Sequence, residues 1–193
     1  MERALGTKLF LKADRCNSPK CVMIRRPQRP GMHGAKRHNV SEFGRQLQEK
    51  QKIRLVYGLT NRQIQNLFKV NEDKTKIMTI LETRLDRVVY LLGLAGSPRV
   101  ARQLVSHGHI QVNGRKVTIP SFRVRIHDVI QVRPESRKAK IFEEISLKMK
   151  QYTPPVWLKI SKEELKGECV AMPNFEETVF PFNVSLVGQF YSK

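Results

Sequence analysis

Residues 81–132 constrain the fold of this chain most, because their apolar pattern changes from helical to strand-like spacing within one short segment. At the start of this segment, apolar residues recur at the spacing of one face of an amphipathic helix. These residues are Leu81, Leu85, Val88, Val89 and Leu92. Gly93 follows directly. The pattern therefore predicts one helix that begins at about Leu81 and ends before Gly93.

A second helix is predicted from Ser97 to about Ser106. Ser97 is an N-cap residue, and Pro98 occupies the first helical position, where its missing N–H costs nothing. Gly108 is placed to end the helix. Arg99, Arg102 and Ser106 share a face at spacings of three and four residues, away from the apolar side.

A hairpin is predicted around Asn113-Gly114, the dipeptide that most strongly favours a two-residue β-turn. The alternation in residues 120–132, with a turn at His127-Asp128, predicts two further strands. Residues 81–132 are thus predicted to form two helices and a small, mostly antiparallel sheet with cations on one side.

The remaining elements are predicted from caps and breakers. A helix from Ser41 to about Tyr57 is followed by one that opens with a capping box at Thr60 and Gln63. Residues 70–76 are interpreted as a linker and 137–151 as a helix, and residues 186–191 have the spacing of a docked terminal helix. Trp157 is expected to pack as an apolar anchor. Within residues 1–40 no helix is predicted, and residues 8–12 are interpreted as a short strand.

These elements predict an α+β fold with three parts. Residues 1–40 form an irregular basic N-terminal arm, which would include a zinc knuckle if zinc is bound. Residues 41–80 form a helical subdomain that residues 178–193 complete, and residues 81–177 form an inserted RNA-binding domain of two helices packed on a small sheet. The central motif of that domain is 81–132.

The charge of the chain points to a polyanionic partner. The net charge is +19 and the pI about 10.3. Residues 1–57 carry 14 basic and 4 acidic side chains and residues 58–133 carry 13 and 5, whereas residues 134–193 carry 9 and 8. No apolar run approaches transmembrane length, and no signal peptide is recognised. We therefore expect RNA and not a membrane as the partner, and a cytoplasmic location.

The segment 25–38 has two interpretations. It is either a disordered basic tail or an arm that becomes ordered on RNA, and its two prolines and two glycines favour the arm. Arm residues expected at phosphates are Arg25, Arg26, Arg29, Lys36 and Arg37. The other expected RNA-binding residues are Arg45, Lys50, Lys52, Arg54, Arg84, Arg87, Arg99, Arg102, Gln103, Ser106, His107, Asn113, Arg115 and Lys116.

Catalytic chemistry is not indicated. The five histidines are scattered, and residues 93–98 lack the lysine and preceding strand of a phosphate-binding loop. Asp86 lies between Arg84 and Arg87, so we interpret it as a structural ion pair or as a group that orients an arginine. The prediction is a protein without catalytic residues and without a small-molecule substrate.

The three cysteines do not suggest disulfides. Cys169 is interpreted as a small buried hydrophobe. Cys16 and Cys21 could supply two thiolates to zinc, but a closed structural site requires four ligands. Taken alone, half a site argues against a metal.

With these residues in view, the chain resembles the family of the fourth protein of the small ribosomal subunit, of bacterial or organellar type. The resemblance covers nearly the whole length: it includes PGMHGAKRH, FGRQLQEKQKIRLVYGLTNRQIQNLFK, the segment 81–132 and the closing QFYSK. Residues 81–132 alone resemble a domain that this family shares with some pseudouridine synthases, a bacterial tyrosyl-transfer-RNA synthetase and a small heat-shock protein.

The resemblance implies a structural protein that binds small-subunit ribosomal RNA early in assembly, at a multi-helix junction in the five-prime domain. It also implies that the protein lines the channel through which messenger RNA enters, beside the third and fifth small-subunit proteins, and that it influences translational accuracy. Lys36 and Arg37 match basic residues implicated in opening messenger structure, whereas Asn39 stands where some members have arginine. An organellar ribosome is the alternative to a cytoplasmic one.

The resemblance also bears on zinc. Zinc-binding members have a cysteine pair ahead of the segment at 8–12 and a second pair that matches Cys16 and Cys21. This chain begins at about the place where the first pair would end. Zinc is therefore expected only if two further ligands lie upstream of the given N-terminus; otherwise no cofactor is expected. The rival hypotheses are an RNA-modifying enzyme that uses the same module and a free RNA chaperone or repressor.

Overall fold

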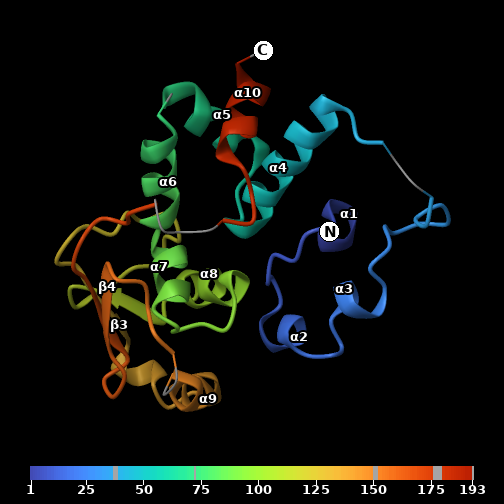
Figure 1. Cartoon of the computed structure of the whole chain (residues 1–193). Helices are drawn as coiled ribbons and strands as arrows, with labels where there is room; N and C mark the ends of the chain where they lie inside the picture. The colour runs from blue at the N-terminus through green and yellow to red at the C-terminus, as the bar shows by residue number, and fades with distance from the viewer. Residues whose placement is uncertain (37–38, 72, 150–151, 176–179, 193) are drawn as a thin grey trace. The chain divides into compact units, whose positions relative to one another are not determined.

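The computed structural model describes residues 1–36, 39–71, 73–149, 152–175 and 180–192 (Figure 1). It divides into two compact units, Met1–Ile77 with Thr178–Lys193 and Met78–Glu177. Each unit has its own buried apolar residues. The two units are therefore described separately.

The first unit begins with three short helices, which were not predicted: α1 (Glu2–Leu5), α2 (Ala13–Asn17) and α3 (Val22–Arg25). The strand predicted at 8–12 is wrong. Phe10 has a positive φ of 53°, which interrupts an extended backbone, and the N–H of Leu9 donates to Glu2 Oε1 (2.8 Å) and not to a neighbouring strand. The burial of Leu9 and Leu11 produced the alternation that suggested a strand.

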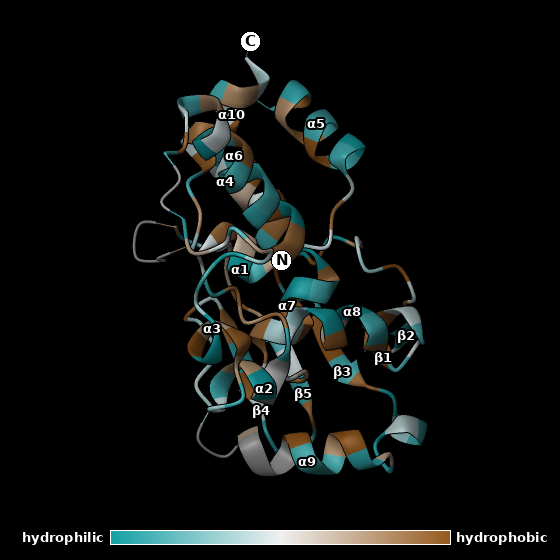
Figure 2. Cartoon of the chain, turned by 90° about the vertical axis from the view of Figure 1, so that its right-hand side faces the viewer, coloured by the Kyte–Doolittle hydropathy of each residue, from teal (hydrophilic) through white to brown (hydrophobic). Residues whose placement is uncertain are grey.

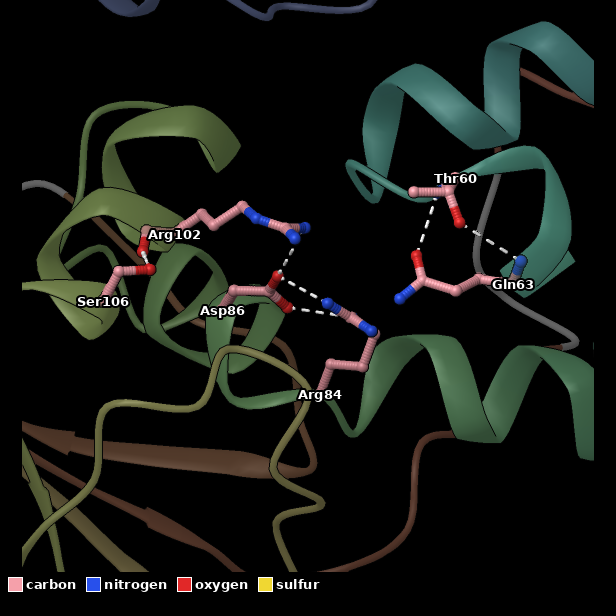
Figure 3. A network of polar contacts seen from close by, with 6 residues as sticks. All are labelled: Thr60, Gln63, Arg84, Asp86, Arg102 and Ser106. Atoms are coloured by element: carbon pink, nitrogen blue, oxygen red, sulfur yellow. Dashed lines mark hydrogen bonds and ion pairs between the residues drawn. The ribbon is translucent and has the colours of Figure 1, made fainter.

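The two long helices of this unit form as their caps predict. α4 (Glu42–Val56) begins after Ser41, whose Oγ accepts from the N–H of Gly44 (3.2 Å). α5 (Asn61–Val70) begins with the predicted capping box: the N–H of Gln63 donates to Thr60 Oγ1 (3.3 Å), and Gln63 Oε1 accepts from the N–H of Thr60 (2.9 Å; Figure 3). Both cap predictions are confirmed.

The C-terminal helix α10 (Val184–Tyr191) lies beside α4 and α5 (Figure 1). Its Val187 is fully buried, the Phe190 ring lies 5.4 Å from that of Phe43, and the Tyr191 ring lies 5.6 Å from that of Phe68. These aromatic contacts hold the helix in place. The prediction of a docked terminal helix is confirmed.

The segment that leads into the second unit differs from the prediction. α6 (Lys74–Glu82) occupies part of the predicted linker, and the helix expected from Leu81 is instead divided into α6 and α7 (Leu85–Leu91). The division is caused by pairing with a distant segment: Thr83 O accepts from the N–H of Val124 (2.8 Å), and Phe122 O accepts from the N–H of Leu85 (2.8 Å). The same pairing explains why residues 120–126 do not form the predicted strand of the sheet.

The rest of the central motif folds as predicted. α8 (Pro98–Ser106) starts at Ser97, whose Oγ accepts from the N–H of Val100 (3.4 Å). β1 (Ile110–Val112) and β2 (Arg115–Lys116) flank a turn in which Asn113 and Gly114 both have positive φ, 50° and 77°. The second helix and the hairpin are confirmed.

The sheet of the second unit has the order β2-β1-β3-β5-β4, and every neighbouring pair is antiparallel. β3 (Val129–Val132) was predicted, whereas β4 (Leu158–Ser161) and β5 (Lys166–Cys169) were not. The signal for β5 is weak because its sequence is KGEC. Its Gly167 packs so closely on Leu92 that a Cβ at Gly167 would lie 2.4 Å from Leu92 Cδ2. The predicted α+β class is confirmed.

The core of the second unit contains buried residues of α7, α8, the sheet and α9 (Lys140–Met149). A 3₁₀ turn, Pro134–Ser136, lies between β3 and α9 and has no buried residue. Hydrophobic and hydrophilic residues alternate along α8 and α9, as expected for amphipathic helices (Figure 2). Trp157 is 9% exposed and packs in this core, which confirms the predicted anchor. Among the described residues, no helix is both long and apolar enough to cross a membrane.

Candidate nucleic-acid interface

The centre of the candidate interface is a buried carboxylate that binds two arginines. Asp86 is 6% exposed, and its Oδ1 and Oδ2 accept from Arg84 Nε (3.0 Å) and Nη2 (2.8 Å; Figure 3). The Nη1 of Arg102 lies 3.6 Å from Asp86 Oδ2. The Arg84 side chain is 9% exposed, but that of Arg102 is 40% exposed. The interpretation of Asp86 as a member of a structural ion pair is confirmed. Asp86, Arg84 and Arg102 form the Asp86 cluster, in which Arg102 is the member that solvent reaches.

A second carboxylate holds the next arginine of this segment. Both carboxylate oxygens of Glu82 accept from Arg87 Nε at 3.1 Å, and the Arg87 guanidinium lies 5.3 Å from the centre of the Tyr90 ring. Arg84 and Arg87 were both predicted as RNA-binding residues. The structure places both in contacts within the protein, Arg84 with Asp86 and Arg87 with Glu82.

The exposed face of α8 carries most of the predicted residues of this helix. Arg99, Gln103, Ser106 and His107 are exposed, and Ser106 Oγ donates to Arg102 O (2.9 Å; Figure 3). Because Ser106 already bonds to its own helix, its hydroxyl proton is not available while that bond lasts. The arginines and Gln103 are the groups that this face presents.

The hairpin adjoins the end of α8. A Cβ built on Gly108, which follows α8 and has φ +76°, would lie 2.3 Å from Lys116 Cε, so the Lys116 side chain passes directly over this glycine. Arg115 and Lys116 are exposed. The hairpin therefore extends the cationic face of α8.

Asn113, another predicted RNA-binding residue, fixes the turn of the hairpin. Its Nδ2 donates to Asp128 Oδ1 and its Oδ1 accepts from the N–H of Val129, both at 2.8 Å. The other Asp128 oxygen accepts from the N–H of Arg125 (2.7 Å). These bonds hold the hairpin against the 123–128 loop.

Two exposed cations in this loop, Arg123 and Arg125, were missing from the predicted site. Arg123 pairs through its backbone with Arg84, so the loop lies next to the Asp86 cluster. The sequence contains a signal for them, because arginine alternates with apolar residues in 122–126. That alternation was interpreted only as evidence for a strand.

In the first unit, the arm presents exposed cations. Arg25 and Arg26, at the end of α3, and Lys36 are exposed. Arg29 is partly buried, and its carbonyl accepts from Arg3 Nη2 (3.3 Å), while Arg3 Nε donates to Gln28 O (2.9 Å). Arg37 lies outside the described residues. The arm thus contacts α1 through two backbone carbonyls, and its ordering on RNA stays a prediction.

The cations of α4 fall into two groups. Arg45 and Arg54 are exposed, although Arg54 Nη1 also donates to Gln51 Oε1 (3.3 Å). Lys52 Nζ instead lies 2.6 Å from Glu49 Oε1. Lys50 Nζ lies 4.4 Å from the centre of the Phe190 ring, and burial, followed by the charge of Arg54, lowers the pKa of Lys50. Lys50 and Lys52 were both predicted RNA-binding residues, and both are engaged within the protein.

The cysteines have two different environments. Cys169 is fully buried, as predicted, and burial, with Asp128 and Glu168 nearby, raises the pKa of its thiol. Cys16 and Cys21 are buried and line one cavity of about 150 Å³. Within the described part of the chain, no group of three or more His, Cys, Asp or Glu residues could hold a metal. The described residues therefore do not form a four-ligand zinc site, and zinc at Cys16 and Cys21 stays a prediction.

Two family models match the chain. Residues 1–88 match the ribosomal protein S4/S9 N-terminal domain, and residues 83–130 match the S4 domain. The second match covers α7, α8, the hairpin and the Asp86 cluster.

Full-length relatives share nearly half of their residues with the chain. Three of them, each named small ribosomal subunit protein uS4, come from Halothermothrix orenii, Thermus thermophilus and Nitratidesulfovibrio vulgaris. They are 45%, 46% and 45% identical to this chain, and the matches cover 99%, 99% and 100% of it and 94%, 94% and 95% of the relatives.

Proposed function

The chain belongs to the uS4 family of small ribosomal subunit proteins, and from that membership we propose that it holds a multi-helix junction in the five-prime domain of small-subunit ribosomal RNA. As a member of this family it is a structural constituent of the small subunit and not an enzyme. Early binding at the junction would nucleate assembly. We further propose that this ribosome is cytoplasmic, because the relatives named above are bacterial.

The observation that carries the proposal is the cationic face of α8 and the hairpin. Arg99 and Lys116 are exposed on it, and Arg102 extends into it while Asp86 holds its guanidinium group at 3.6 Å. A-form RNA offers proteins its phosphates and minor groove more than its base edges, so a rigid set of cations suits a junction. An arginine that already pairs with a carboxylate loses less side-chain conformational entropy on binding a phosphate than an unpaired arginine does.

The test is the salt dependence of binding to a five-prime-domain RNA fragment. Arg102→Ala removes one phosphate contact, so the slope of log K against log salt concentration should fall by about 0.7–0.9. Lys159→Ala, which removes an exposed cation of β4, is the matched control and should leave the slope unchanged. An unchanged slope and affinity for Arg102→Ala would remove this face from the interface.

A second proposed role is at the channel through which messenger RNA enters the small subunit, next to the third and fifth proteins, with an influence on accuracy. The exposed Lys36 supports it, as one of the arm cations. In reconstituted subunits, Lys36→Ala should slow translation through a structured messenger and leave an unstructured messenger unaffected. If Lys36→Ala changed the translation rate, relative to wild type, by the same factor on the structured and the unstructured messenger, the result would contradict this role.

A further inference from the structure

The segment 119–126 exposes an aromatic ring and two arginines, and we propose that it binds an unpaired stretch of RNA, with Phe122 stacked on one of its bases. Phe122 is 36% exposed, and Arg123 and Arg125 are exposed as well. Val124 packs in the core of the second unit and so fixes the segment while its neighbours face solvent. The inference rests on the proposed binding of RNA by α8 and the hairpin, and it adds a second kind of contact to that interface.

The backbone of this segment is held by hydrogen bonds within the second unit. The N–H of Val124 donates to Thr83 O (2.8 Å), and Phe122 O accepts from the N–H of Leu85 (2.8 Å). The N–H of Phe122 donates to Ile119 O (3.1 Å), so both backbone polar groups of the proposed stacking residue are engaged. A platform that is ordered before its ligand arrives loses little conformational entropy on binding.

The apolar side chains of the segment favour unpaired over paired nucleotides. Ile119 and Ile126 are exposed in addition to Phe122. An A-form duplex presents phosphates and sugar hydroxyls, against which these side chains gain little, whereas bases in loops and bulges are splayed out and stack on aromatic rings and guanidinium planes. Arg123 and Arg125 supply cations for the phosphates on either side of a stacked base. The segment therefore suits single-stranded RNA.

Position and charge favour RNA over a protein as the partner of this segment. Arg123 pairs through its backbone with Arg84, and the N–H of Asp86 donates to Pro120 O (3.2 Å), so the segment adjoins the Asp86 cluster. Aromatic residues and arginine are also enriched at protein interfaces. Residues 118–127, however, contain two arginines and no carboxylate, a balance that suits a polyanion.

The first measurement is the affinity of the full chain for the five-prime-domain RNA fragment. Phe122→Leu keeps an apolar side chain and removes the flat ring, so the affinity should fall by about 5-fold or more, and the salt slope should not change because the ring carries no charge. Phe122→Tyr keeps the ring and should bind like wild type. Ile141→Ala is the matched control, because Ile141 is 39% exposed on α9 of the same unit, and it should also bind like wild type. Circular dichroism reports whether each variant is folded.

The second measurement identifies the nucleotide that the ring contacts. The photo-crosslinker p-benzoylphenylalanine replaces Phe122, and the chain is irradiated with the RNA fragment and, separately, within reconstituted small subunits. The expected crosslink in both samples is to a nucleotide that chemical probing shows to be unpaired. Removal of that base from the RNA should weaken binding of wild type and leave the affinity of Phe122→Leu unchanged, because the two changes remove the same contact.

Several results would overturn the inference: a crosslink to a paired nucleotide, a crosslink to a ribosomal protein, the absence of any RNA crosslink, or wild-type affinity of Phe122→Leu. The crosslink decides the question even if Phe122→Leu does not fold. The proposed function is tested separately, through the salt slope of Arg102→Ala. A lowered slope in Arg102→Ala together with wild-type affinity of Phe122→Leu would leave the proposed function in place and remove only the stacking contact.

Discussion

Asp86→Asn tests whether the candidate interface is organised by its buried carboxylate. The substitution keeps the size of the side chain and removes its charge. It leaves Arg84, with a side chain 9% exposed, without its ionic partner, and removes the carboxylate that lies 3.6 Å from Arg102. Both stability and RNA binding should therefore change.

The expected loss of stability follows from the burial of the pair. Removal of one partner from a buried ion pair costs about 3–5 kcal/mol, because the other charge remains buried. Asparagine retains one acceptor for the Arg84 guanidinium, so we expect the lower value, about 3 kcal/mol. With a urea m-value of about 1.5 kcal/mol per M, the unfolding midpoint should fall by about 2 M.

Trp157 provides the assay. It is the only tryptophan of the chain, and it packs in the core that also contains Leu85 and Val88, the neighbours of Asp86 in α7. Its fluorescence therefore reports unfolding of the second unit. Glu163→Gln is the control, since it removes one exposed negative charge from the same unit, and it should shift stability by less than about 0.5 kcal/mol.

The RNA measurement separates orientation from net charge. Asp86→Asn and Glu163→Gln both raise the net charge by one, so long-range attraction alone would strengthen RNA binding equally in the two variants. If Asp86 orients Arg102, Asp86→Asn should bind RNA more weakly than Glu163→Gln. A midpoint close to that of wild type, together with equal RNA affinities of the two variants, would refute the reasoning.

Three further predictions concern packing and pH. Gly93→Ala should destabilise the second unit by at least about 1–2 kcal/mol in urea unfolding, because Gly93 has φ +77° and a Cβ there would lie 2.8 Å from Tyr152 Cδ1. Burial raises the pKa of Tyr152, whose hydroxyl donates to Leu91 O (2.8 Å), so its contribution to stability is present below about pH 10 and is lost as the pH rises above it. Tyr152→Phe should therefore make the decline of stability above about pH 10 shallower, and an unchanged decline would contradict this. Phe190→Leu removes the ring that contacts Lys50 and should weaken the docking of α10 by about 1 kcal/mol, measured as faster amide hydrogen exchange in that helix; unchanged exchange would argue against a role for the ring.

The sequence was sufficient to predict those elements whose structure is determined by residues close together in the chain. The Ser97-Pro98 start of α8 and the positive φ angles of the Asn113-Gly114 turn follow from the chemistry of those residues themselves, and both elements were predicted. β5 could not be predicted in the same way. Its Gly167 is explained only by the close approach of Leu92, which is distant in the sequence.

The candidate site shows the same limit. Cationic residues could be selected by charge and spacing, but whether each one faces solvent or a protein partner depends on tertiary contacts. Lys50 shows this clearly, because the ring that it contacts belongs to Phe190, near the other end of the chain. No local pattern around Lys50 indicates that contact.

The error at residues 81–85 has the greatest consequence for the site. In a continuous helix, residues two apart point in different directions, so Arg84 and Asp86 could not form a bidentate pair. The backbone pairing of Arg84 with Arg123 interrupts the helix, and Arg84 adopts the extended conformation of an N-cap (φ −64°, ψ 140°). From there its guanidinium reaches Asp86 in the first turn of α7. The break that the periodic pattern concealed is therefore what allows the Asp86 cluster to form, and the 120–126 segment contributes to the interface by creating that break.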